Sequence, residues 1–515
     1  MIAKVFSCAV LGIDGCPVEV EVDISGRGLP SLDLIGLPDP SVREAKERVR
    51  SAIRNSGFRF PDTRVTVNLA PADLKKEGPG FDLAIAVGLL IADGQIPYED
   101  KIKQTVLVGE LSLDGTLRSI PGSLAIASSM LKKGSQTNEL FVPHANAREA
   151  SLIDGITVRG VKTLQELINH LTDEEHIPVT EPDIETMYHE NIQGIDMEEV
   201  KGQENAKRAM EIAAAGAHNV LFYGPPGTGK TMLARRLPSI LPEPSLDEML
   251  ETTRIHSVAG KLPPETPLLT NRPFRCPHHS SSSVGIIGGG KIPRPGEVSL
   301  AHRGVLFLDE LPEFPREVIE SLRQPLEDRL VTITRAAATL QYPADFIFAS
   351  SMNPCNCGFF GDPRHPCRCT NAQIQRYRAK LSAPLLDRID IQIEVPRLDY
   401  SVIETKTVPE SSAVIRERVK VARARQTARF KGSKIITNSE MGPRQVKKYC
   451  PLNNEARALA KQAFNRLGMS MRAYDRILKV SRTIADLESS EEIAAHHLAE
   501  AIQYRNLDRE LFREG

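Results

Sequence analysis

Near its N-terminus the chain contains a segment that alternates apolar and polar side chains, which is the period of a strand with one buried face. VEVEVDI (18–24) shows this alternation clearly, and Asp14 and Gly15 interrupt the apolar stretch that precedes it. Because a secretion signal needs an unbroken apolar core, this pattern predicts a β-hairpin rather than a signal peptide.

The spacing then changes to that of helices. In DPSVREAKERVRSAIRNSG (39–57), apolar residues recur every three or four positions, a capping Asp or Ser precedes them, and Gly57 follows. The predicted buried face consists of Val42, Ala45, Val49, Ala52 and Ile53. LAIAVGLLIA (83–92) is apolar on all sides but too short to cross a bilayer, so we expect a core helix and no membrane association.

These patterns divide the chain into four segments. Residues 1–172 and 192–400 both mix strand and helix patterns, whereas 401–515 is mostly helical. Between the two mixed segments, residues 173–191 form a predicted linker, whose DEEHIPVTEPDIETMYHE contains seven acids and no Lys or Arg. The predicted fold class is therefore a multidomain α/β protein that ends in a helical domain.

Composition narrows the function only slightly. The 515 residues suffice for two to four domains, and 41% hydrophobic with 25% charged residues is typical of a globular protein. The net charge of −1 means that any contact with nucleic acid needs local basic patches. Four of the eight cysteines are scattered without a disulfide pattern, which favours a reduced, cytoplasmic setting: Cys8, Cys16, Cys276 and Cys450.

The strongest chemical signal is VLFYGPPGTGKT (220–231), in which an apolar strand leads into G-x-x-x-x-G-K-T and then a helix. Glycines at these positions let backbone N–H groups surround the phosphates of ATP. Lys230 is predicted to reach the β- and γ-phosphates, and Thr231 to offer its hydroxyl to Mg²⁺. The predicted nucleotide-binding residues are Gly224, Pro225, Pro226, Gly227, Thr228, Gly229, Lys230 and Thr231.

Further polar residues follow in the order expected of an ATPase. VLFLDE (305–310) is a buried strand ending in Asp309, a predicted Mg²⁺ ligand, and Glu310, which would polarise the attacking water. DFIFASSMN (345–353) is another strand, and it ends in Asn353. Arg388 in LLDRID and Arg472 in MRAYDR come later in the chain.

This order of parts is similar to that of AAA+ ATPases. VKGQENAKRAMEIAAAGAHNVLFYGPPGTGKT, PGEVSLAHRGVLFLDELPEF and LLDRIDI resemble the magnesium-chelatase-like branch. The resemblance implies a parallel-sheet core with a helical lid, sensor roles for Asn353 and Arg472, and an arginine finger at Arg388 that acts on a neighbouring subunit. Arg476 is the alternative lid arginine. The resemblance therefore implies a ring, and a homo-hexamer is expected, assembled with or without the help of ATP or DNA.

The N-terminal segment resembles the proteolytic domain of Lon, through KKEGPGFDLAIAVGLL (75–90) and VGELSLDGTLRSIPGSLAIA (108–127). At the position of Lon's nucleophilic serine the chain has Gly80, and at the position of its general-base lysine it has Ile126. A Ser–Lys dyad needs both groups, so we expect this domain to be inactive as a protease.

The combination resembles the ComM/YifB-type proteins over nearly the whole chain, with GLPDPSVREAKERVRSAI, VNLAPADLKKEGPGFDL, RPFRCPHH and SMRAYDRILKVSRTIADL as its distinctive strings. The resemblance implies an ATP-driven helicase that binds branched or single-stranded DNA. It would promote branch migration during recombination or natural transformation. Two alternatives remain open: a chelatase-type ATPase that drives metal insertion with partner subunits, and a remodeller of proteins without a DNA role.

Three segments are candidates for DNA contact. RLVTITRAAATLQYP (329–343) predicts a β-hairpin with Arg335 at its tip, and GGGKIPRPG (288–296) predicts a loop with Lys291 and Arg294. RERVKVARARQTARFKGSK (416–434) is a basic helix that either contacts phosphates or forms a solvated or inter-subunit face. For RPFRCPHHSSSS (272–283) the sequence offers no physical account.

The remaining four cysteines lie together in NPCNCGFFGDPRHPCRCT (353–370) as two Cys-x-Cys pairs. Four thiolates at this spacing can hold a tetrahedral structural zinc ion, and His365 could replace one of them. Unligated thiols and an iron–sulfur cluster are the alternatives. The predicted ligands are Cys355, Cys357, Cys367 and Cys369.

Overall fold

The computed structural model describes residues 2–25, 29–131, 137–184, 195–263, 265–290, 293–335, 338–399, 409–467 and 469–505. The chain divides into two compact units, one of Met1–Asn191 with Leu246–Thr270, the other of Ile192–Ser245 with Asn271–Gly515. Across the described ranges, no helix combines the length and the apolar character that a membrane span requires.

A seven-stranded sheet forms the centre of the first unit, in the order β3-β4-β2-β1-β5-β8-β9. The predicted hairpin is confirmed, because β1 (Ile2–Leu11) and β2 (Asp14–Ile24) pair antiparallel along their whole length. Its alternating valines are buried, as the period-2 pattern requires. The other strands are β3 Ser31–Ile35, β4 Arg64–Ala70, β5 Thr105–Leu107, β8 Glu139–Pro143 and β9 Thr157–Val161, and β6 (Glu110–Leu111) pairs with β7 (Leu117–Arg118) separately.

The predicted amphipathic helix is α1 (Pro40–Asn55), and all five residues of its predicted apolar face are buried. It begins where the Asp39 carboxylate accepts the N–H of Val42 at 2.8 Å, which satisfies one of the free donors of the first turn. The predicted core helix is α2 (Asp82–Ala92), buried at every position. The other helices of the unit are α3 Ser123–Met130, α4 His144–Ala150, α5 Leu164–Leu171 and α9 Leu246–Val258.

Helix α9 belongs to the first unit, although the sequence placed it within the 192–400 segment. Its Met249 is buried in one cluster with Leu124 and Leu152. The Ser257 hydroxyl accepts the N–H of Gly122 at 2.9 Å. Periodicity within a helix does not reveal which domain receives its apolar face, so this placement could not be read from the sequence.

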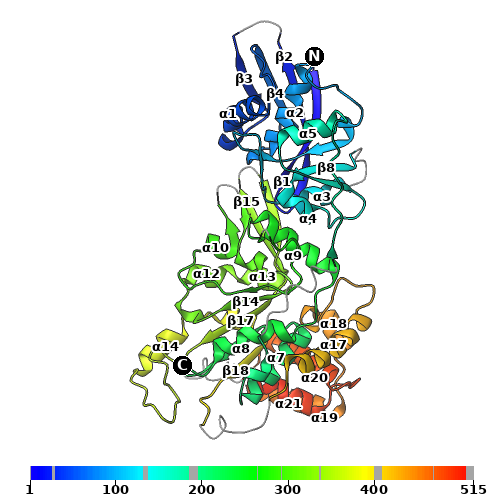
Figure 1. The fold of residues 1–515 in the computed structure, drawn as a ribbon. Coiled ribbons are helices and arrows are strands. Elements are labelled where there is room, and N and C mark those ends of the chain that lie inside the picture. Colours follow the sequence, from blue (N-terminus) through cyan, green and yellow to red (C-terminus); the bar gives the residue numbers. More distant parts are fainter. Residues whose placement is uncertain are drawn as a thin grey trace. The chain divides into compact units, whose positions relative to one another are not determined.

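The second unit is built on a five-stranded parallel sheet, in the order β11-β14-β17-β10-β18. Figure 1 shows α7 and α8 beside β17 and β18 of this sheet. The strands are β10 Val220–Tyr223, β11 Phe274–Arg275, β14 Val305–Leu308, β17 Ile347–Met352 and β18 Ile391–Glu394. Because all five strands run in one direction, the residues that follow them meet at one edge, where open α/β sheets bind ligands.

Helices cover this sheet and continue into a helical C-terminal region, which confirms the predicted fold class. In Figure 1, α17 and α20 gather beside α7, and all three contribute to one buried apolar cluster. The core helices are α7 Glu204–Gly216, α8 Lys230–Arg236, α10 Ser283–Ile287, α11 Glu297–Leu300, α12 Arg316–Ser321, α13 Arg323–Asp328, α14 Asn371–Arg378 and α15 Ala383–Leu386. The C-terminal helices are α17 Ser412–Arg429, α18 Pro443–Tyr449, α19 Asn454–Leu467, α20 Met471–Leu487 and α21 Ala495–Gln503.

Two short antiparallel hairpins lie in the connections between the strands of this sheet. Strands β12 (Gly288–Gly289) and β13 (Arg294–Pro295) form the first, and β15 (Leu330–Arg335) and β16 (Ala338–Pro343) form the second. The hairpin predicted at 329–343 is thereby confirmed.

Candidate nucleotide site

The predicted phosphate loop connects β10 to α8 at the carboxyl edge of the sheet. Its first glycine is required by a close approach, because a Cβ on Gly224 would lie 2.3 Å from the carbonyl oxygen of Val395. Gly229 has φ 91, a left-handed conformation that glycine adopts without strain, and it places Lys230 at the start of α8. The loop therefore presents its backbone N–H groups and a helix N-terminus in the arrangement that binds phosphate.

Lys230 begins α8 and Asn353 directly follows β17, but the two side chains lie together. The Lys230 ammonium donates to the carbonyls of Gly224 and Pro225 at 2.8 Å each and to Oδ1 of Asn353 at 3.2 Å. Burial lowers the pKa of Lys230 to about 8, against the opposing influence of Asp309 and Glu310. The folded chain thus holds a partly desolvated amine where the phosphates of a nucleotide would lie.

This pKa leads to a pH prediction. Phosphate oxygens favour the charged amine, so binding raises the pKa of Lys230 and takes up a proton. ATP affinity is therefore expected to be full below pH 8 and to fall as pH rises above 8, by up to about tenfold per unit. Titration of a fluorescent ATP analogue from pH 7 to 10 measures this. The Lys230→Arg variant, which keeps its charge, should show a flat profile, and a flat wild-type profile would contradict the prediction.

Thr231 and Asp309 offer the oxygen ligands that Mg²⁺ prefers. The Thr231 hydroxyl donates to Oδ2 of Asp309 at 2.7 Å, so the first turn of α8 and the end of β14 are in direct contact. Glu310 follows with an exposed side chain and φ 53, a left-handed backbone conformation. These residues fit a Mg²⁺–nucleotide group by the type and proximity of their donors.

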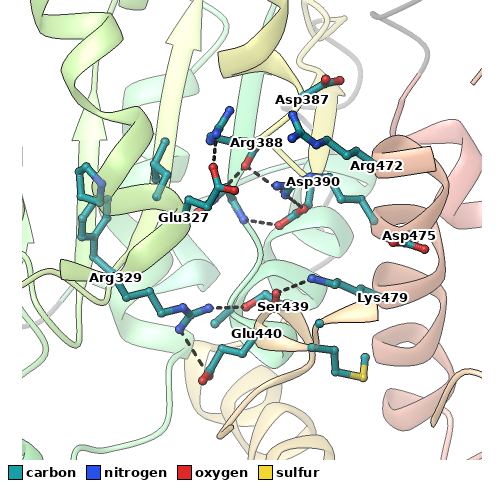
Figure 2. Close-up of a pocket in the computed structure, with 18 of the residues that line it drawn as sticks. Glu327, Arg329, Asp387, Arg388, Asp390, Ser439, Glu440, Arg472, Asp475 and Lys479 are labelled. Atoms are coloured by element: carbon teal, nitrogen blue, oxygen red, sulfur yellow. Dashed lines mark hydrogen bonds and ion pairs between the residues drawn. The ribbon is translucent and has the colours of Figure 1, made fainter. Parts of the chain in front are cut away.

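The two predicted arginines lie at the other edge of the same sheet. Arg388 and Arg472 line a pocket of about 370 Å³ (Figure 2), whose wall includes residues that precede three of the strands. These residues are Asn219, Phe346 and Asp390. The phosphate loop follows the opposite end of β10. Within one chain, neither arginine is therefore placed beside Lys230.

Arg388 is held in this pocket by its own chain. Its guanidinium donates to the carbonyl of Pro384 at 2.7 Å and forms an ion pair with Glu327. Its backbone carbonyl accepts from the side chains of Asn219, at 2.9 Å, and Arg476, at 3.3 Å. Figure 2 shows Glu327 beside Arg388.

Arg476, the alternative lid arginine, forms an ion pair with the buried Asp390. Burial alone would raise the pKa of Asp390, but Arg476 and His218 hold it well below its usual range. This contact joins α20 to the segment that carries Arg388, so the core and the C-terminal helices meet at a buried charge.

Two of the three candidate DNA-contacting residues lie in the two hairpins. Arg294 is exposed in β13, and Arg335 is the last residue of β15, opposite Ala338. Lys291 lies outside the described residues. The structure thus assigns Arg294 and Arg335 to two separate hairpins rather than to the five-stranded sheet.

The basic helix α17 is less available to phosphates than its composition suggested. Arg418 pairs with Glu211 and with Glu410, and Arg429 pairs with Asp486. Lys420 and Arg416 both reach Glu243. Because these carboxylates come from other parts of the unit, much of the positive charge is neutralised within the fold.

The segment RPFRCPHHSSSS lies at the carboxyl edge, beside the acids of β14. Phe274 in β11 stacks on Phe307 with ring centres 6.1 Å apart, and Arg275 pairs with Glu297 at 2.6 Å. Burial, with a smaller contribution from the charge of Asp309, raises the pKa of Cys276. The first part of this segment therefore anchors the edge strand, a role that sequence reasoning missed because β11 is only two residues long.

The four clustered cysteines converge. The Sγ atom of Cys367 lies 3.7 Å from that of Cys355 and 3.6 Å from that of Cys357, and all four ligand atoms lie within 4.8 Å of one another. Thiolates about 2.3 Å from a zinc ion are separated by roughly 3.8 Å in a tetrahedron, so this spacing fits the metal. His365 is turned away, stacked on Phe359 and 3.5 Å from Asp362. The thiols match a Cys₄ site without His365.

This cluster also touches the nucleotide site. Cys355 is buried two residues after Asn353. A Cβ on Gly358 would lie 2.8 Å from Cδ of Pro226 and 4.0 Å from Cγ of Asn353. The first Cys-x-Cys turn therefore packs on the phosphate loop itself.

In the first unit, the position of a Lon-type dyad is apolar. A Cβ on Gly80 would lie 3.4 Å from Cγ1 of Val108, and Val108 is buried in one cluster with Ile126. Neither a hydroxyl nor an amine is present at these two positions. This is the arrangement of a packed core.

Three family models match successive parts of the chain. The families described as magnesium chelatase subunit ChlI, subunit ChlI of Mg-chelatase, and the ChlI C-terminal region match residues 196–403, 20–146 and 409–505. Competence protein ComM of Haemophilus influenzae is 44% identical over 99% of this chain and 98% of its own length. Protein YifB of Escherichia coli is 42% identical over 97% and 96%.

Lon protease 2 of Bacillus subtilis is 30% identical over 30% of this chain and 30% of its own length. ComM and YifB match nearly the whole chain. Two of the chelatase families match the segment with the parallel sheet and the phosphate loop and the segment with the C-terminal helices. The chain therefore belongs to the ComM/YifB family of magnesium-chelatase-like AAA+ ATPases.

Proposed function

We propose that this protein is a homo-hexameric ATPase motor that couples ATP hydrolysis to the remodelling of branched DNA, as in branch migration during recombination or natural transformation. The single observation that supports a ring is the position of Arg388 and Arg472, at the edge of the sheet opposite the phosphate loop. An arginine finger placed there reaches only the nucleotide of a neighbouring subunit. The name of the competence relative supports the DNA role.

In this proposal, Lys230 binds the β- and γ-phosphates, and Thr231 and Asp309 hold Mg²⁺. Glu310 polarises the attacking water, and Asn353 orients the γ-phosphate beside Lys230. A bound Mg²⁺ would neutralise charge that develops on the phosphates. Every one of these side chains lies at the carboxyl edge of one sheet.

The hairpins supply the proposed DNA contacts. Six copies of Arg294 and Arg335 would form two rings of positive charge, which suits a phosphate backbone rather than a base sequence. Lys291, three positions before Arg294 in the sequence, is a further candidate for contact with DNA. The cations of α17 that pair with carboxylates are not among the proposed DNA contacts, because their charge is already neutralised within the fold.

The DNA role is tested by measuring ATP turnover with and without a four-way junction over a series of salt concentrations. We expect stimulation that fades steeply with salt, because each phosphate contact releases counterions. Arg294→Ala and Arg335→Ala should both reduce the salt slope, whereas Arg457→Ala, at an exposed position on α19, should not. No stimulation by any DNA and no binding to junctions would leave protein remodelling as the better account.

We also propose that the first unit is a scaffold without peptidase activity. The packed apolar contact between Gly80, Val108 and Ile126 supports this, since a Ser–Lys mechanism needs an attacking oxygen and a deprotonated amine. ATP-dependent cleavage of casein that is lost in Lys230→Ala would contradict it. A sequence in which four cysteines cluster and the other four show no disulfide pattern fits a reducing, cytoplasmic setting.

The Cys₄ cluster is proposed to hold a structural zinc ion. Backbone N–H groups of Arg368 and Phe359 lower the pKa of Cys357 to about 6, whereas burial and the neighbouring thiols raise the pKa values of Cys367 and Cys369. Four protein ligands leave no open position, so the metal would stabilise the segment rather than react. Because Gly358 packs on Pro226, an ordered cluster would also support the phosphate loop.

Metal analysis tests this directly. Protein purified without chelator should contain roughly one zinc per chain, and Cys355→Ser should contain less than about a tenth of that. Cys276→Ser, at a cysteine outside the cluster, is the matched control and should retain the metal. Removal of the metal is also expected to weaken ATP binding. Less than about half a zinc per chain in the wild type would contradict the proposal.

A further inference from the structure

Ser351 is a buried residue within DFIFASSMN (345–353), and the sequence assigned no role to it. It lies in β17, two residues before Asn353, and is 1% exposed. Strand β17 runs parallel to β14, with Ser350 opposite Leu308. Ser351 is thereby placed beside the two acids that follow β14.

Its hydroxyl contacts both acidic residues. The Oγ atom donates to Oδ1 of Asp309 and accepts the backbone N–H of Glu310 at 3.0 Å. The other carboxylate oxygen of Asp309, Oδ2, accepts from the Thr231 hydroxyl at 2.7 Å. One serine thus holds one oxygen of Asp309, so that the other oxygen is directed towards Thr231.

The contact with Glu310 acts on the backbone. Glu310 has φ 53, a conformation that a non-glycine residue adopts only when its surroundings hold it there. Its N–H is bound by Ser351 and, at 3.2 Å, by Oδ1 of Asp309. Loss of the serine hydroxyl would leave this turn with one fewer constraint.

The neighbouring serine provides a comparison. Ser350 is fully buried on the other face of β17, and among the described residues its hydroxyl has no hydrogen-bond partner. Since successive residues of a strand point to opposite faces, only Ser351 can reach the acids. The two serines therefore share burial and chemistry but differ in what they contact.

We propose that Ser351 is a positioning residue for the Mg²⁺–nucleotide site, which orients Asp309 towards Thr231 and holds the backbone of Glu310. Groups that bind a metal-ligating carboxylate from behind typically contribute 10–100-fold to metal affinity or activity. This inference rests on the ATPase alone and is independent of the proposed DNA role.

The test is Mg²⁺-dependent binding of a fluorescent ATP analogue. In Ser351→Ala, the Mg²⁺ concentration that half-saturates binding should rise about tenfold or more, while binding in EDTA stays within about twofold of the wild type. ATP turnover should fall by about 10–100-fold. Ser350→Ala should match the wild type in all three measurements.

Two further variants separate positioning from folding. Ser351→Cys keeps the side-chain volume but replaces the oxygen by a weak hydrogen-bonding sulfur, so it should show the same loss even if Ser351→Ala does not fold. Ser351→Thr keeps the oxygen and should recover part of the Mg²⁺ affinity. An unchanged Mg²⁺ requirement in Ser351→Ala or Ser351→Cys, or an equal loss of binding with and without Mg²⁺, would overturn the proposal.

Discussion

Replacement of Glu310 by glutamine is expected to reduce ATP turnover by about 100-fold or more and to leave ATP binding intact. A carboxylate can accept a proton from the attacking water, whereas an amide cannot. Binding should persist because the phosphate contacts come from the loop and Lys230, not from the exposed Glu310 side chain. Measurement of single-turnover hydrolysis beside equilibrium binding of the ATP analogue separates the two effects.

Glu313 offers a matched control. It lies three residues later in the chain, and its carboxylate pairs with Lys380 at 3.2 Å on the surface. Glu313→Gln should retain nearly full turnover, since a surface ion pair contributes little. In junction dissociation assays, Glu310→Gln is expected to bind branched DNA without separating it. Turnover within twofold of the wild type in Glu310→Gln would show that another group activates the water.

A second large effect on ATP turnover is expected when rings are assembled from two different inactive variants. Arg388→Ala alone should lose roughly 10³-fold or more in turnover, because a finger stabilises charge in the transition state. Lys230→Ala should also be inactive, since it lacks the phosphate contact. A mixture of the two is expected to regain activity, because a subunit with an intact loop can then lie beside one with an intact Arg388. Arg472→Ala should behave like Arg388→Ala, as both line the same pocket.

The control for these mixtures is Arg457→Ala, which should be active alone. If the two inactive variants assemble together and the mixture remains inactive, the arginines do not act between subunits. The ion pair between Glu327 and Arg388 bears on how the finger would act. Since Glu327 pairs with Arg388 in the free chain, this ion pair must open before the guanidinium can reach a neighbour.

Much of both units could be predicted because the signals are local. The glycines and Lys230 lie within one loop, and a loop between a strand and a helix can take few forms when it must bind phosphate. The five-residue apolar face of α1 was likewise readable, since a helix repeats every 3.6 residues regardless of what covers it. The two hairpins at 2–24 and 330–343 were predicted from the period-2 alternation of apolar and polar residues.

Residues that act through distant partners could not be found in this way. Ser351 carries no motif, and its relation to Asp309 exists only because β17 lies next to β14. The cations of α17 resembled a phosphate-binding face until the fold placed Glu211, Glu243 and Asp486 against them. In both cases the partner is far away in sequence, and composition does not specify it.

The sequence by itself determined the phosphate loop, the acids of β14, the pairing of Cys-x-Cys turns and the absence of a Ser–Lys dyad at Gly80 and Ile126. Each of these depends on residue identity at fixed local spacing. Only the tertiary structure decided that the Cys turn packs on Pro226, that α9 joins the first unit, and that Arg388 and Arg472 share the edge opposite Lys230. The physical reason is that strand order and the burial of helix faces, which arise from packing between distant segments, set which side chains meet.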